Sequence, residues 1–157
     1  MPVTRHPLMP LQTGDHPVSA DADAVSRLDA SLGTLVAKGR PIAANFYQSL
    51  FAAHPSLRPL FPDDMSRLER KLIDSLVTVV GLLRKPSEAA GILREMGLRH
   101  RELGARPEHY PIVCRLLVHS MAQEFGELWT DQLAFEWFQV LELVSRHMID
   151  AQGPQSR

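Results

Sequence analysis

The segment 96–111, MGLRHRELGARPEHYP, places a histidine, His100, where helical spacing predicts an apolar side chain. The residues that share its helical face are all apolar: Ala89, Ile92, Leu93, Met96 and Leu103. We therefore expect the imidazole to point into the core, where it needs a hydrogen-bond partner. No Asp or Glu lies one turn away on this face. Two roles are open for His100: a core histidine bonded to a backbone carbonyl, or a ligand of a metal or cofactor.

The other histidines and the cysteine do not build a zinc site with His100. The sequence has a single cysteine and no HExxH motif, and His109 follows nine residues later, beyond a glycine and a proline. A single nitrogen among apolar residues matches the needs of an iron porphyrin, which takes one neutral axial ligand and a dry, apolar slot. The pattern therefore favours a porphyrin site over a four-ligand zinc centre.

Helices must position these side chains, because every long proline-free span carries apolar residues at helical spacing. These spans are 18–40, 63–85, 87–106 and 112–153. A further helix is expected to follow Pro41, and no span has the alternation that is typical of a strand. The sequence therefore predicts an all-α domain.

Four residues are expected to mark the ends of helices. Ser87 is a candidate N-cap for the helix that carries His100, and Gly104 is expected to end that helix. Pro107 is expected in the first turn of the next helix, and Thr130 is expected to cap the last one.

Composition and charge predict one soluble domain. The 157 residues, 45% of them hydrophobic, suit a single domain, which we place at 19–152 between a flexible extension, 1–18, and a tail, 153–157. A net charge of -1 disfavours nucleic acid and anionic membranes as partners. No stretch resembles a signal peptide or approaches the ~20 apolar residues of a membrane span. We expect a cytoplasmic protein whose single cysteine, Cys114, is a core residue.

Three stretches resemble single-domain bacterial globins, a family related to the haem domain of flavohaemoglobins. They are FYQSLFAAHPSLRPLF at 46–61, RKLIDSL at 70–76 and RHRELGARPEHYPIV at 99–113, in the order that the family has them. The resemblance covers residues 20–152, nearly the whole expected domain. It implies a globin fold, a helical sandwich around haem b, with haem b as the cofactor.

The resemblance also implies roles for particular residues. His100 matches the proximal histidine that binds the haem iron, and Phe61 matches the phenylalanine that packs flat on the porphyrin. Tyr47 matches the distal tyrosine whose hydroxyl can reach a bound gas, and Tyr110 matches a tyrosine near the proximal imidazole, whose ring its hydroxyl could orient. The remaining residues expected to contact the cofactor are Leu60, Leu68, Leu72, Arg99, Val113 and Leu117.

Two positions depart from the family pattern. Leu68 stands where the family usually has glutamine and other globins have histidine, so no polar side chain is expected from that position. Gln152 aligns with a glutamate of the last helix, unless a shift of register places Asp150 there. A neutral amide makes the proximal imidazole less electron-donating than a carboxylate does, which disfavours peroxidase-like activity.

The resemblance leaves three functions to distinguish. The first is reversible binding of dioxygen or another diatomic gas, such as carbon monoxide or nitric oxide, for delivery, storage or sensing. The second is a nitric oxide dioxygenase, and the third is a haem-free interaction module with the globin fold, which His100, Phe61 and Tyr47 together disfavour. Because the sequence ends at Arg157 without flavin and nicotinamide domains, any turnover is expected to need an external reductase.

Overall fold

The computed structural model describes residues 21–153, so the expected extension 1–18 and the last four residues of the expected tail lie outside the described part. Within it the chain forms helices and no strand, which confirms the all-α prediction. The elements, in chain order, are α1 (Ala22–Ala37), α2 (Gly39–Ala53), η1 (Pro55–Leu60), α3 (Ser66–Leu82), α4 (Pro86–Glu102), α5 (His109–Phe125), η2 (Gly126–Leu128) and α6 (Asp131–Gln152).

Two of the predicted helix ends are confirmed. The Thr130 hydroxyl accepts a hydrogen bond from the Leu133 backbone N–H at 3.0 Å and so caps α6. Helix α4 ends before Gly104, whose φ of +104° lies in a region that favours glycine.

Three other boundaries differ from the prediction, and each involves a proline. Helix α2 begins at Gly39, two residues before Pro41, because a proline in the first turn removes no intrahelical hydrogen bond. Helix α4 begins at Pro86, whose fixed φ suits the first helical position, so Ser87 lies inside the helix instead of capping it. Helix α5 begins at His109, because Pro107 belongs to the preceding turn.

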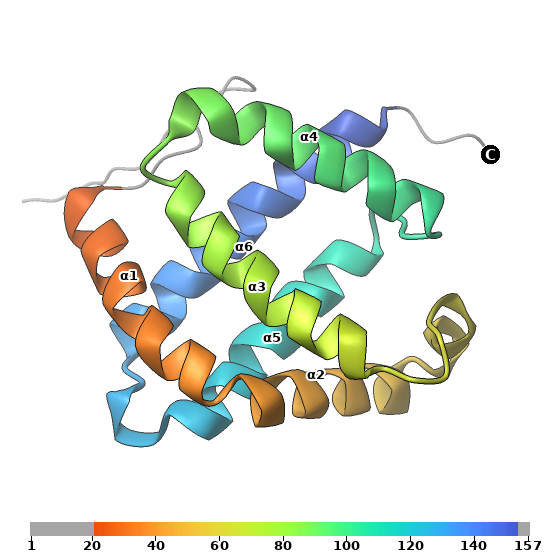
Figure 1. The fold of residues 1–157 in the computed structure, drawn as a ribbon, viewed down its shortest axis with the longest axis horizontal. Coiled ribbons are helices and arrows are strands. Elements are labelled where there is room, and N and C mark those ends of the chain that lie inside the picture. The colour runs from red at the N-terminus through yellow and green to blue at the C-terminus, as the bar shows by residue number, and fades with distance from the viewer. Residues whose placement is uncertain (1–20, 154–157) are drawn as a thin grey trace, which may run out of the picture.

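The helices form two layers around a common core. Helix α3 crosses in front of α5 and α6, while α4 and α2 lie at opposite edges of the molecule (Figure 1). Helix α4 packs mainly against α6, and α2 packs against α5 and α3. Helix α1 contacts both α3 and α6, so it closes the remaining side.

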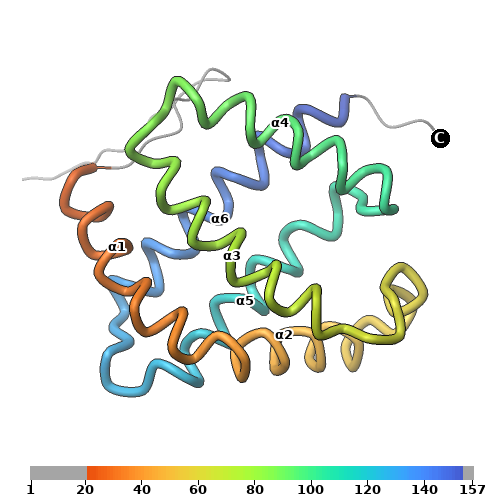
Figure 2. Tube along the Cα trace, in the orientation of Figure 1, coloured from red at the N-terminus to blue at the C-terminus, as the bar shows by residue number. Residues whose placement is uncertain are grey.

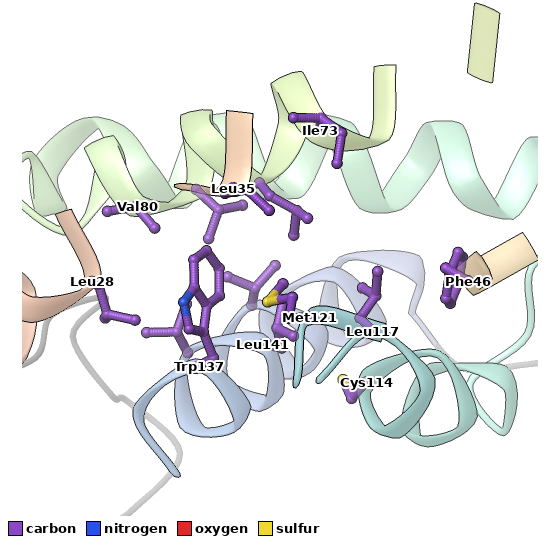
Figure 3. Packing of buried hydrophobic residues seen from close by; sticks show 14 of the residues in the cluster. Leu28, Leu35, Phe46, Ile73, Val80, Cys114, Leu117, Met121, Trp137 and Leu141 are labelled. Atoms are coloured by element: carbon purple, nitrogen blue, oxygen red, sulfur yellow. The ribbon is translucent and has the colours of Figure 1, made fainter. Parts of the chain in front are cut away.

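Trp137 of α6 is the largest fully buried side chain of the core. Leu28 of α1 and Val80 of α3 belong to the same buried cluster and lie near the Trp137 ring in the close view (Figure 3). The indole N–H donates to the Ser31 hydroxyl at 3.1 Å, and that hydroxyl donates to the Leu28 carbonyl at 2.6 Å. The one polar atom of the indole is thereby satisfied, as burial requires.

A charged pair also joins α1 to α6. The buried Glu136 carboxylate accepts hydrogen bonds from the Arg27 guanidinium and, at 2.8 Å, from the Gln132 amide. The arginine lowers the pKa of Glu136 below its ordinary value, chiefly through this hydrogen bond.

None of the helices in residues 21–153 is long and apolar enough to cross a membrane.

Candidate functional site

His100 lies on the fourth helix, but its side chain is exposed, so the prediction that it points into the core was wrong. The face of α4 that is buried against the protein consists of Ala89, Leu93 and Gly97. His100 belongs to a neighbouring stripe in which Ile92 is 37% exposed and Leu103 65% exposed. Periodicity identified the two adjacent stripes as one face, and only the stripe that ends in the small Gly97 packs on another helix.

The imidazole of His100 is held by its own helix. Its Nδ1 lies 2.8 Å from the carbonyl oxygen of Met96, one turn earlier. Because a carbonyl can only accept, Nδ1 carries the hydrogen, and in the neutral form of the ring Nε2 then has the lone pair. Among residues 21–153 no group hydrogen-bonds to Nε2. The bond to a backbone carbonyl expected of a core histidine is therefore present on an exposed ring, and the role of His100 as a ligand stays a prediction.

The turn that carries His100 lies very close to α6. A Cβ atom added at Gly97 would stand 2.4 Å from the carbonyl oxygen of Met148 and 2.8 Å from its Cα. Glycine is therefore required where these two helices cross.

Gln152, the last residue of α6, is fully buried beside the His100 turn. Its Nε2 donates to the Tyr110 hydroxyl at 2.8 Å and to the Gly97 carbonyl at 3.3 Å. Asp150 is exposed, so of the two candidates it is Gln152 that faces Tyr110. The Tyr110 ring lies 6.5 Å from the His100 ring between centroids, but its hydroxyl bonds Gln152. The expectation that Tyr110 orients the imidazole is therefore corrected, because the Met96 carbonyl does so.

Tyr47 lies in a cluster of aromatic side chains at the end of α2. Its ring packs edge-on against Phe46 and Phe61, at centroid distances of 4.9 and 5.7 Å, and stacks on Phe51 at 6.0 Å. Its hydroxyl has no hydrogen-bond partner within the described part of the chain. Burial, and to a smaller extent the nearby charge of Glu69, raises the pKa of Tyr47 to about 12. The phenol is therefore a protonated donor without an acceptor.

Phe61 is held in place from the preceding 3-10 helix. The Arg58 guanidinium donates to the Phe61 carbonyl at 3.2 Å and to the Pro62 carbonyl at 2.9 Å, and it also lies 4.9 Å from the Phe51 ring centroid. These contacts tie the corner between η1 and α3 to the aromatic cluster of Tyr47.

The end of the His100 helix meets this corner. Leu60, which is 43% exposed, lies over Gly104, since a Cβ at that glycine would stand 2.9 Å from Leu60 Cδ2. Figure 2 shows η1 and the turn after α4 on the same side of the molecule. The structure thus joins the His100 turn, through Leu60 and Phe61, to Tyr47.

The remaining predicted residues divide by their exposure. Leu68 and Leu72 are half-buried on α3, Val113 is half-buried and Leu117 buried on α5, and Arg99 is exposed. Sequence reasoning missed Glu69, whose negative charge contributes to the raised pKa of Tyr47. It considered only the preceding residue, the apolar Leu68. The signal that could have found it is its place in the first turn of the helix that carries Leu68.

A family model described as Globin matches residues 44–148. The chain belongs to the globin family. The flavohaemoprotein of Rhizobium meliloti is 30% identical to this globin over 115 residues, which cover 70% of this chain and 28% of the relative. The chain therefore spans little more than a quarter of the length of that relative.

Solved structures agree with this assignment at the level of the fold. A globin of Campylobacter jejuni superposes with a TM-score of 0.74 at 16% identity, covering 84% of this chain and 96% of its own. The flavohaemoglobin of Malassezia yamatoensis, solved with bound FAD and haem, has a TM-score of 0.69 at 20% identity and covers 84% of this chain and 36% of its own.

Haem is the cofactor of this family, and the site residues of this globin suit it. An imidazole with a free Nε2 provides the single nitrogen that haem iron takes from a globin. The exposed apolar stripe around it, with Ile92 and Leu103, is of the kind that a flat macrocycle can cover.

Proposed function

We propose that this globin binds dioxygen reversibly, with His100 as the protein ligand of haem iron and Tyr47 as the donor to the bound gas. The observation that carries the proposal is the state of His100. Its Nδ1 lies within hydrogen-bond distance of the Met96 carbonyl oxygen, and among residues 21–153 no group bonds its Nε2 and no carboxylate bonds the ring, which lies on the same stripe of α4 as the exposed Ile92 and Leu103.

Haem supplies the iron that binds a diatomic gas. His100 would hold the iron through Nε2, because the Met96 carbonyl occupies Nδ1 and fixes the orientation of the imidazole. Phe61 is proposed to pack against the porphyrin, because Arg58 and the aromatic cluster hold it in place. Leu68 and Leu72 keep the gas side apolar and exclude water.

Tyr47 is proposed to hold the gas by donating its hydroxyl hydrogen. The hydroxyl has no competing partner among the described residues, so it can turn toward a ligand without breaking another bond. With a pKa of about 12 in the haem-free chain, Tyr47 stays protonated at neutral pH, so its hydroxyl keeps the hydrogen that it would donate. A tyrosine in this state favours a gas whose outer atom accepts a hydrogen bond, as dioxygen does.

The proximal side supports binding over oxygen-bond cleavage. Gln152 offers Tyr110 a neutral amide hydrogen at 2.8 Å. No carboxylate bonds His100 within residues 21–153, and the Nδ1–H donates to the neutral Met96 carbonyl, which makes the imidazole less electron-donating than a carboxylate partner would.

The test is the rate of oxygen release, measured by displacing oxygen with carbon monoxide in a stopped-flow instrument. A charge-assisted hydrogen bond contributes about 1.5–3 kcal/mol, which corresponds to about a tenfold to hundredfold change in affinity. Tyr47→Phe should therefore release oxygen at least about tenfold faster, while the release of carbon monoxide, a weaker acceptor, changes much less. Leu68→Gln should slow oxygen release or leave it unchanged.

Other outcomes would replace the proposal. A Tyr47→Phe protein that releases oxygen at the wild-type rate would mean that another group holds the ligand. Stoichiometric nitrate from nitric oxide, formed at multiple turnovers with a separate reductase, would instead support a nitric oxide dioxygenase. A purified chain without a haem absorption band after incubation with haemin would leave only the interaction module.

A further inference from the structure

Apart from the backbone bonds within α6, Gln152 takes part in three hydrogen bonds with the described residues, and two of them reach the turn that carries His100. Its side-chain amide donates to the Gly97 carbonyl at 3.3 Å, and its own backbone carbonyl accepts from Arg101 Nη1 at 2.7 Å. The third bond, to the Tyr110 hydroxyl, is 2.8 Å long. The end of α6 is therefore hydrogen-bonded to α4 on both sides of His100, at Gly97 and at Arg101. We call this pair of contacts the grip of Gln152 on α4.

This grip acts where the two helices are already closest. Gly97 has no room for a Cβ against Met148, so the backbones of α4 and α6 are in direct contact one turn before His100. A hydrogen bond to the Gly97 carbonyl prevents the turn from moving away from α6. Because Met96, the residue before Gly97, holds the imidazole, any shift of this turn moves the ring with it.

The contacts also require a hydrogen-bond donor in the side chain of residue 152. The Gly97 carbonyl can only accept, so the side chain that faces it must present a hydrogen. The amide does this with Nε2 and leaves its Oε1 buried without a partner in the described part of the chain. A carboxylate at this place would set an oxygen against the Gly97 oxygen, which is repulsive.

We propose that Gln152 is a positioning residue that holds the His100 turn against α6 by donating to the Gly97 carbonyl and the Tyr110 hydroxyl. The inference rests on the proposed function in one respect only, namely that His100 is the iron ligand. The contacts of Gln152 with residues 97–101 do not depend on haem and can be tested in the haem-free protein. Their effect on the histidine is measured in the haem-loaded protein.

The variant Gln152→Met keeps the length of the side chain and removes both donated hydrogen bonds. Gln139→Met is its matched control, because Gln139 is an exposed residue of the same helix. In the haem-free protein, amide hydrogen exchange of residues 97–101 should accelerate about tenfold in Gln152→Met and stay unchanged in Gln139→Met. Equal exchange in both variants would overturn the grip.

In the haem-loaded protein the measurements are the iron–histidine stretching band of the ferrous form and the rate of haem transfer to a scavenger apoprotein. Gln152→Met should shift or broaden the band and raise haem loss about tenfold. Gln152→Glu, which keeps the length but replaces the donor, should lose haem as fast as Gln152→Met at pH 8. Haem retention at the wild-type rate in Gln152→Glu would refute the requirement for a donor.

A double-mutant cycle with Tyr110→Phe separates positioning from general stability. Because the Tyr110 hydroxyl bonds Gln152, Tyr110→Phe should shift the band less than Gln152→Met, and the double variant should match Gln152→Met alone. Additive shifts would show that Tyr110 acts independently and would contradict the network. If the wild type fails to bind haem, the proposed function falls, while the exchange experiment still decides the grip.

Discussion

Replacing Gly97 with alanine adds a single methyl group at the crossing of α4 and α6. That methyl carbon would lie 2.4 Å from the Met148 carbonyl oxygen, and an ordinary contact begins at 3.4 Å, so the two backbones must separate by about 1 Å. No side-chain rotation relieves this clash, because the atoms that it meets belong to the main chain. We expect Gly97→Ala to push the His100 turn away from α6.

The magnitude follows from two opposing effects. Alanine favours a helix over glycine by about 1 kcal/mol, whereas overpacking of a rigid contact costs about 1–3 kcal/mol or more. Gly91→Ala is the matched control, since it lies in the same helix with nothing within 4 Å of the added Cβ. Gly91→Ala should stabilise the fold by up to about 1 kcal/mol. The helix-propensity gain is common to both variants, so Gly97→Ala should be less stable than this control by the overpacking cost alone, about 1–3 kcal/mol.

Urea denaturation followed by far-ultraviolet circular dichroism measures both free energies of unfolding. The hydrogen bond from Gln152 to the Gly97 carbonyl is 3.3 Å long, so a displacement of about 1 Å would break it, and the iron–histidine band should shift as well. A Gly97→Ala protein with the same urea midpoint as Gly91→Ala would show that the crossing is looser than described and would refute the reasoning.

Three further predictions concern the stability and reactivity of other groups. The Cys114 thiol is buried, and burial raises its pKa, so a thiol reagent should label the native protein slowly; rapid labelling would contradict its place in the core. Arg27→Met should lower the free energy of unfolding at pH 7, because it removes the hydrogen bonds that the guanidinium donates to the buried Glu136 carboxylate. The arginine lowers the pKa of Glu136, so this difference is present above pH ~4.3 and should fade in urea titrations at lower pH. Burial raises the pKa of Tyr110 to about 12, so the unfolded chain loses this proton above pH 10 while the folded chain keeps it. Stability should therefore fall between pH 10 and 12, by about 2–3 kcal/mol more than in Tyr110→Phe.

The sequence could predict the helices, because helical periodicity depends on local information, and it could single out His100 as a candidate ligand on the same ground. Apolar spacing between prolines follows directly from helical geometry, and Thr130 caps α6 through its own hydroxyl as predicted. A lone histidine in an apolar stripe stands out for the same reason. These features need no knowledge of which helix packs on which.

What the sequence could not predict depends on tertiary contacts. The exposed stripe with Leu103 and the buried stripe with Gly97 lie next to each other on α4. Only the crossing with α6 decides which of the two is buried. The direction of the hydrogen bond between Gln152 and Tyr110 is likewise set by a third group, the Gly97 carbonyl. The alignment could name Gln152 as a candidate, but not its two acceptors.

The contact between Leu60 and Gly104 has a consequence for timescales. At Gly97 the neighbour is backbone, so any opening between α4 and α6 requires collective helix motion, which occurs in microseconds to milliseconds. At Gly104 the neighbour is the end of one half-exposed leucine side chain, which changes rotamer in picoseconds to nanoseconds. The timescales on which the contacts at Gly97 and at Gly104 open therefore differ by about a thousandfold or more. The contact between Leu60 and Gly104 can therefore open and close without a movement of the helix that carries His100.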